Sequence, residues 1–118
     1  MLWNATLATI LATVVTESQD DLVGVWLVLR WVRSTFPQFN PDEARSASLI
    51  IIEKGLESGA LSAGSFLPGS SDVFQTWGLD ARASLEKIAH AWDALGREPD
   101  IGDNLWLIGR GLEYTTLR

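Results

Sequence analysis

Four stretches of the chain carry apolar residues at helical spacing. In the first, the apolar residues lie three or four positions apart, at positions 3, 7, 10, 11, 14 and 15. Asn4 is suited to the N-cap of this helix. The run is shorter than the ~20 residues of a membrane span, and no Lys or Arg precedes it as in a signal peptide. We therefore expect a core helix and a cytoplasmic protein.

The second stretch is the most apolar. It begins at Asp20 or Asp21, either of which can open a helix, and it ends at Phe36 because Pro37 disfavours further helical turns. Apolar residues lie on both sides of this helix, so we expect it to pack on two faces.

The third and fourth stretches have clear start and stop signals. Asn40 followed by Pro41 predicts the start of the third helix, and Gly59 predicts its end. Asp80 predicts the cap of a fourth helix over residues 81–95, which Gly96 ends.

Short alternating segments lie between and after these helices. Residues 60–66 predict a strand, and residues 67–72 a loop that Phe74 and Trp77 are expected to anchor to the core. Residues 104–108 and 112–117 predict a terminal β-hairpin around the turn 109–111.

These elements predict an α+β fold, mostly helical, with about four helices and a small antiparallel sheet in a single domain over residues 1–118. Three helices followed by strands also fit a winged-helix-like arrangement, with the third helix in the place of the recognition helix. That helix carries more acidic than basic residues, whereas a helix in the major groove presents Arg, Lys, Asn or Gln. Its charged residues are Asp42, Glu43, Arg45, Glu53, Lys54 and Glu57.

The charge and residue composition argue against several classes of function. The 118 residues include 9 Lys and Arg against 15 Asp and Glu, which gives a net charge of −6, and the pI is about 4.6. Such a chain repels nucleic acid and anionic membranes and attracts a basic partner. It has no cysteine and a single histidine, His90, so thiolate nucleophiles, cysteine zinc sites and a histidine-based triad are not expected. We expect no enzyme, no cofactor and no metal.

The segment after the fourth helix gathers acidic residues, Glu98, Asp100 and Asp103, with Asn104 beside them. Oxygen ligands of this kind can hold a hard cation, but the spacing lacks the order of an EF-hand loop. The alternative is a tight loop in which the acids cap turns or pair with Arg97.

Six tryptophans are the least ordinary feature of the composition. Trp26, Trp31 and Trp92 occupy helical core positions and are expected to be packing residues. Trp77 and Trp106 lie beside the loops, where aromatic residues next to carboxylates are typical of an interface for a basic protein. The alternative is that both attach loops to the core.

The segment from Trp92 to Trp106 resembles a group of small uncharacterised bacterial proteins. In that group a helix ending in Trp and Leu-Gly-Arg is followed by a Pro, a Gly-Asp and a further Trp. Residues 20–26, Asp-Asp-Leu-Val-Gly-Val-Trp, are similar to the start of their second helix. The shared motifs are structural, and the resemblance implies no catalytic residues. In size and acidity the chain also resembles immunity proteins of bacterial toxin–immunity systems, which implies occlusion of a toxin's active site.

The sequence therefore predicts a protein-binding module, most concretely an immunity-type inhibitor of a basic, nuclease-like toxin. The alternative is a winged-helix transcription regulator, or a relative that no longer binds DNA. Monomer and homodimer both stay open, because the first helix could pack within one chain or between two. The expected partner-binding residues are Asp72, Trp77, Glu98, Asp100, Asp103 and Trp106.

Overall fold

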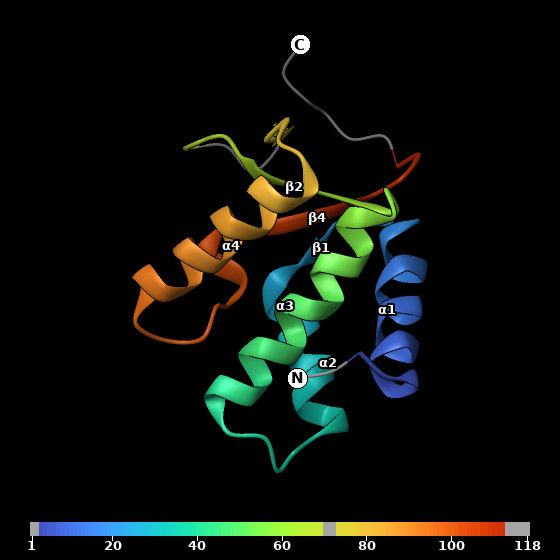
Figure 1. The fold of residues 1–118 in the computed structure, drawn as a ribbon. Helices are drawn as coiled ribbons and strands as arrows, with labels where there is room; N and C mark the ends of the chain where they lie inside the picture. The colour runs from blue at the N-terminus through green and yellow to red at the C-terminus, as the bar shows by residue number, and fades with distance from the viewer. Residues whose placement is uncertain (1–2, 70–72, 113–118) are drawn as a thin grey trace.

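The computed structural model describes residues 3–69 and 73–112. Within them it has four α-helices, four short strands and one 3-10 helix (Figure 1). In chain order these are α1 (Ala5–Ser18), β1 (Val23–Gly24), α2 (Val25–Thr35), α3 (Pro41–Glu57), β2 (Leu61–Phe66), β3 (Phe74–Thr76), α4 (Ala81–Leu95), η1 (Ile101–Asp103) and β4 (Trp106–Gly109). The α+β, mostly helical fold class is confirmed.

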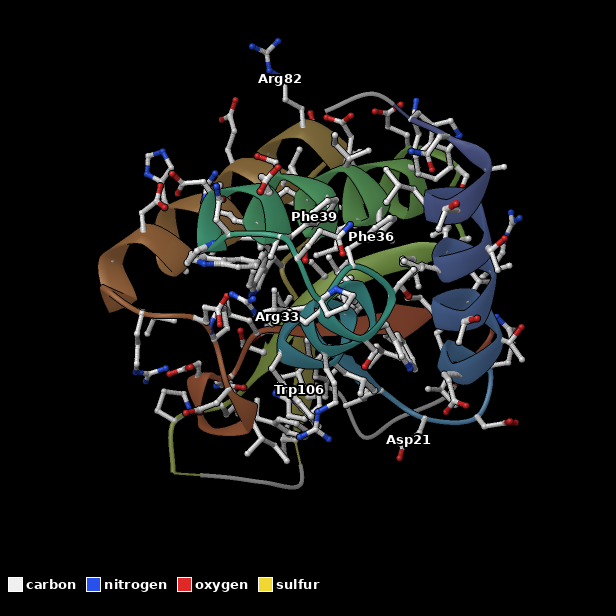
Figure 2. All side chains as sticks on the ribbon, turned by 90° about the horizontal axis from the view of Figure 1, so that it is seen from below. Asp21, Arg33, Phe36, Phe39, Arg82 and Trp106 are labelled. Carbon is white, nitrogen blue, oxygen red and sulfur yellow. The ribbon has the colours of Figure 1, made fainter. Side chains whose placement is uncertain are left out.

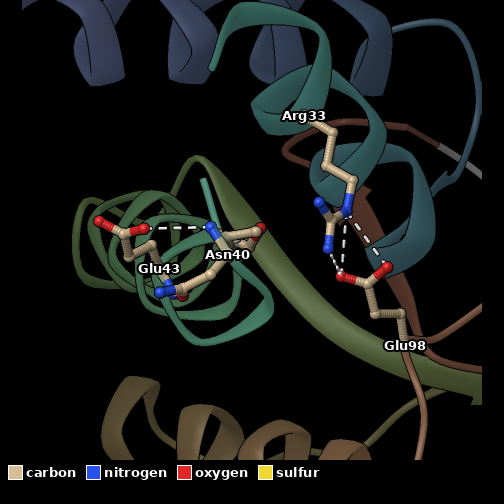
Figure 3. A network of polar contacts seen from close by, with 6 residues as sticks. Arg33, Asn40, Glu43 and Glu98 are labelled. Atoms are coloured by element: carbon tan, nitrogen blue, oxygen red, sulfur yellow. Dashed lines mark hydrogen bonds and ion pairs between the residues drawn. The ribbon is translucent and has the colours of Figure 1, made fainter. Parts of the chain in front are cut away.

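Three of the helix starts are those that the sequence predicts. Asn4 and Asp80 each accept a backbone N–H of the first helical turn, at 2.9 Å in α1 and 2.8 Å in α4. Asn40 accepts from the Glu43 N–H at 2.8 Å, and the Glu43 carboxylate accepts from the Asn40 N–H at 3.0 Å (Figure 3). This reciprocal capping box fixes the start of α3.

The predicted start of the second helix was wrong. The helix begins at Val25, and the two residues before it form β1, in which Val23 pairs with Leu107 and Gly24 with Trp106. Asp21 accepts the N–H of Leu22 rather than capping a helix. The β-branched Val23 is fully buried in this strand, so pairing with a distant strand prevails over the local cap signal.

The sheet has the order β1-β4-β2-β3 with every pair antiparallel. The predicted terminal hairpin is corrected in two respects. Its first strand begins at Trp106, because Asn104 has a left-handed backbone with φ +58°. That strand, β4, pairs with both β1 and β2 and lies inside the sheet. The second predicted strand lies outside the described residues from position 113 onward.

The third helix is the centre of the core. α3 packs against α1, α2, α4 and β2, and Figure 1 shows it between α1 and α4. Its exposed residues are confined to its ends, Pro41 to Glu43 and Glu57. Between these ends the residues of α3 are buried or only partly exposed, which weighs against its use as a recognition helix.

The apolar face of the first helix is buried inside the same chain. Leu7, Ile10 and Val14 of α1 belong to the main core, as do Ala63 and Leu107 of the sheet. The apolar face of α1 is thus covered without a second copy. In the described part of the chain, no helix is both long enough and apolar enough to cross a membrane.

Candidate functional site

The loop that follows α4, residues 96–104, is braced internally. Arg97 donates to Asp103 through Nη1 at 2.7 Å and through Nη2 at 2.8 Å. The same carboxylate accepts the Asp100 N–H at 2.7 Å, and Asp100 in turn accepts the Gly102 N–H at 3.0 Å. The hydrogen bond from Arg97 lowers the pKa of Asp103, and the same bond raises the pKa of Arg97. The alternative prediction, acids that cap turns and pair with Arg97, is confirmed.

A second ion pair attaches this loop to α2. Arg33 Nε lies 3.1 and 3.0 Å from the two carboxylate oxygens of Glu98, and Arg33 Nη2 contacts the second of them (Figure 3). In parallel, Arg45 of α3 donates to Asp93 of α4 at 3.1 Å. All three predicted loop acids therefore have an arginine partner within the chain: Glu98 pairs with Arg33, and both Asp100 and Asp103 pair with Arg97.

Asn104 attaches the end of the loop to the sheet. Its Oδ1 accepts the Phe66 N–H at 2.7 Å, and its Nδ2 donates to the Phe66 carbonyl at 2.9 Å. Ser65 Oγ donates to the Asn104 carbonyl at 2.9 Å. The loop is thus fixed to a helix near its start and to a strand at its end.

Two side chains at the tip of this braced loop face solvent. Ile101 is 64% exposed, more than any other described large apolar residue. Beside it, the Asp100 side chain is 68% exposed and lies 3.6 Å from the nearest nitrogen of Arg97. Asp100 is therefore the predicted loop acid best placed to meet a partner, and Ile101 adds an apolar contact next to it.

The two predicted aromatic anchors do not share a surface. Trp106 alternates with Leu107, whose side chain is in the core, so Trp106 lies on the other face of the sheet. There its ring is 5.7 Å from that of Phe66, edge to face. Trp77 packs against the core and donates to Ser65 Oγ at 3.1 Å, with Lys87 over its ring. These contacts fit the alternative prediction for Trp77, namely that it attaches a loop to the core.

The remaining predicted residues contribute less to this site. Asp72 lies outside the described residues. Phe74 is fully buried and packs edge to face on Phe66 at 5.6 Å. His90 is exposed on α4. No group of three or more His, Asp or Glu side chains that could hold a metal occurs in residues 3–69 and 73–112.

An open groove of about 410 Å³ separates α2 from the loop. We call it the α2 groove. It is lined by Trp26, Arg30 and Arg33 of α2 and by Glu98, Pro99 and Asp100 of the loop. Trp26, predicted as a core residue, is half-buried here. Figure 2 labels Arg33, which extends from α2 at this groove.

Sequence reasoning missed Ile101, Arg30 and the role of Arg33. An isolated apolar residue between Asp100 and Gly102 was the available signal for Ile101. Arg33 and Glu98 are 65 positions apart, so no local pattern joins them.

Comparison with known proteins gives no indication of function, so the proposal below is based on the geometry of the structure. No protein-family model matches this chain, and neither a curated protein nor a solved structure matches it. The resemblance to small bacterial proteins and to immunity proteins stays a prediction.

Proposed function

We propose that this chain is an acidic protein-binding domain that presents loop 96–104 to a basic partner. The most concrete form is an immunity-type inhibitor that covers the cleft of a nuclease-like toxin in the cytoplasm. The observation that carries the proposal is Ile101, an apolar side chain 64% exposed at the tip of a loop that is braced on both sides.

A braced loop suits binding because little conformational freedom is left to lose. Ordering flexible side chains and loops on association costs free energy, so a preorganised loop binds more tightly than a mobile one with the same contacts. The bonds at Glu98, Asp103 and Asn104 supply that order before a partner arrives.

The charge distribution supports a basic partner. The whole chain has a net charge of −6, which accelerates encounter with a basic protein. Near the tip the exposed acid is Asp100, whose side chain is 68% exposed although Arg97 lies 3.6 Å away, whereas the side chain of Asp103 is only 9% exposed. Long-range attraction and one local acid next to an apolar residue are therefore the features we assign to recognition.

The winged-helix alternative has weaker support. Its recognition helix would be α3, which is covered by three helices and a strand, and Arg45 of that helix is bonded to Asp93. Arg110 is exposed in the turn after β4, which leaves one described cation on that side for phosphate.

The test is recovery of a partner from lysate of the native host, with this chain as bait at low and moderate salt. We expect one basic protein in a stoichiometric complex that weakens as salt rises. Asp100→Lys and Ile101→Asp should each lower recovery by about tenfold or more, as truncations at interface centres do. The partner's enzymatic activity is then measured with and without the chain.

Asp20→Lys is the matched control. It makes the same change of two charge units at an exposed acid on the turn after α1, so it should keep most of the recovery. Equal losses in Asp20→Lys and Asp100→Lys would show that only net charge matters. Full recovery with Ile101→Asp would contradict the proposed surface.

A further inference from the structure

The α2 groove contains an arginine held in place by an aromatic ring. The guanidinium carbon of Arg30 lies 5.2 Å from the centre of the Trp26 ring. That ring in turn lies over Gly24, where a β-carbon would come within 2.1 Å of the indole Nε1. The indole can occupy this position because residue 24 has no side chain, and the indole gives Arg30 a defined place at the groove.

The charges around the groove are unequally balanced. The cation of Arg33 is matched by Glu98. Arg30 is exposed, and no ion pair joins it to another described residue. The α2 side of the groove therefore presents one cation with no ion-pair partner among the described residues, while on the loop side Asp100 is exposed and pairs with Arg97 at 3.6 Å.

We propose that the α2 groove binds an acidic side chain, Asp or Glu, of the partner that loop 96–104 contacts. The carboxylate accepts two hydrogen bonds from the guanidinium of Arg30, and the stem packs on Trp26 and Pro99. This inference rests on the proposed function and deepens it. It requires that the contact patch of the basic partner carry an acid beside the cation that meets Asp100.

The chemistry favours a carboxylate at this position. The guanidinium of Arg30 lies over the indole ring and has no ion-pair partner among the described residues. Its N–H donors have the planar arrangement that matches the two oxygens of a carboxylate. A phosphate would bring nearly twice the negative charge toward Asp100 and Glu98 on the loop side. Trp and Arg are also the residue types that contribute most at protein interfaces.

The test uses a blocked amino acid as the probe, so the partner protein is not needed. N-acetyl-aspartate N-methylamide and its asparagine counterpart are titrated into the whole chain, and the indole N–H signal of Trp26 is followed by NMR. We expect a saturable shift of that signal, with the aspartate probe binding about tenfold more tightly than the asparagine probe, as a charge-assisted pair implies.

Two variants test whether Arg30 causes the preference for the aspartate probe. Arg30→Gln should bring the ratio of the two affinities close to one. Arg82→Gln is the matched control, because Arg82 is 89% exposed on α4 and outside the groove, and it should keep the tenfold ratio. Both variants change exposed residues, and the six indole signals show whether the fold is retained.

Three results would overturn the inference. These are a Trp26 signal that does not move, equal binding of both probes, and a preference that survives in Arg30→Gln. The lysate experiment on Asp100 and Ile101 tests the proposed function separately. A groove that binds the aspartate probe with no partner recovered, or the reverse, shows which of the two proposals fails.

Discussion

The side-chain amide of Asn104 pairs with the backbone of Phe66 in both directions, as a residue of a neighbouring strand would. It accepts from the Phe66 N–H at 2.7 Å and donates to the Phe66 carbonyl at 2.9 Å. The backbone of Asn104 has φ +58°, a conformation that asparagine tolerates better than most residues. One side chain thus extends the sheet to the end of the candidate loop.

We predict that Asn104→Asp lowers the free energy of unfolding by about 1–3 kcal/mol. The carboxylate removes the donor to the Phe66 carbonyl and sets two acceptors against each other in a half-buried place. Urea unfolding measures the change. The same substitution at Asn4 is the control, because there only the acceptor is used and Asp caps a helix as well as Asn does. Equal losses at the two sites would contradict the two-way pairing.

The helix caps can be predicted from the sequence, whereas the contacts of the candidate site cannot, because caps are local and these contacts join distant parts of the chain. Asn4, Asn40 and Asp80 bind N–H groups three residues ahead, so the signal is contained in a few neighbouring positions. The bond between Arg33 and Glu98 spans 65 positions. The local pattern could place Glu98 in a loop but could not show that its charge is matched.

The short strand β1 illustrates the same limit. Residues 20–24 carry helix-start signals, and the deciding interaction is pairing of Val23 with Leu107. For the candidate site, the sequence predicted a loop that contains Asp100, and this side chain is exposed. It also grouped Trp77 with Trp106, although they lie on opposite faces of the sheet. Face assignment depends on strand register, which composition does not carry.

We predict that Asp103→Asn destabilises the chain at neutral pH more than Glu86→Gln does. Asp103 accepts from both Arg97 and the backbone of Asp100, and its side chain is 9% exposed. Glu86 makes one contact with Arg82, at 3.3 Å, and both of these side chains are exposed, so solvent screens that pair. Thermal unfolding of the two variants beside the wild type makes the comparison. A larger loss in Glu86→Gln would be inconsistent with a braced loop.

The contribution of Asp103 should also depend on pH, with a defined sign. The pKa of this carboxyl is lowered in the folded chain, chiefly by the hydrogen bond from Arg97, and in the unfolded chain it is about 3.9. Folding therefore favours the ionised form. The stabilisation is complete above the unfolded pKa and is lost as the pH falls through the folded pKa.

We accordingly predict that the stability difference between the wild type and Asp103→Asn is constant from neutral pH down to about 5. It should shrink below about pH 4. Urea unfolding over this range at constant salt measures it. A difference that grew on acidification would mean that Arg97 does not stabilise the carboxylate.

The contact between Gly24 and Trp26 gives the last prediction. Gly24 has φ −70° and ψ 147°, a backbone conformation that alanine adopts without strain. Any loss in Gly24→Ala must therefore come from the new β-carbon, which would stand 2.1 Å from the indole Nε1. We expect a loss of about 1–3 kcal/mol in the free energy of unfolding, as for other insertions into packed sites.

The same clash should vanish when the indole is removed. Gly24→Ala made in a Trp26→Leu chain should cost less than in the wild type, and the difference is the coupling between the two residues. Gly102→Ala is the matched glycine control, since a β-carbon there meets a single atom at an ordinary 3.4 Å. If Gly24→Ala costs the same in both backgrounds, the indole does not lie over residue 24, and Arg30 loses the support on which the α2 groove depends.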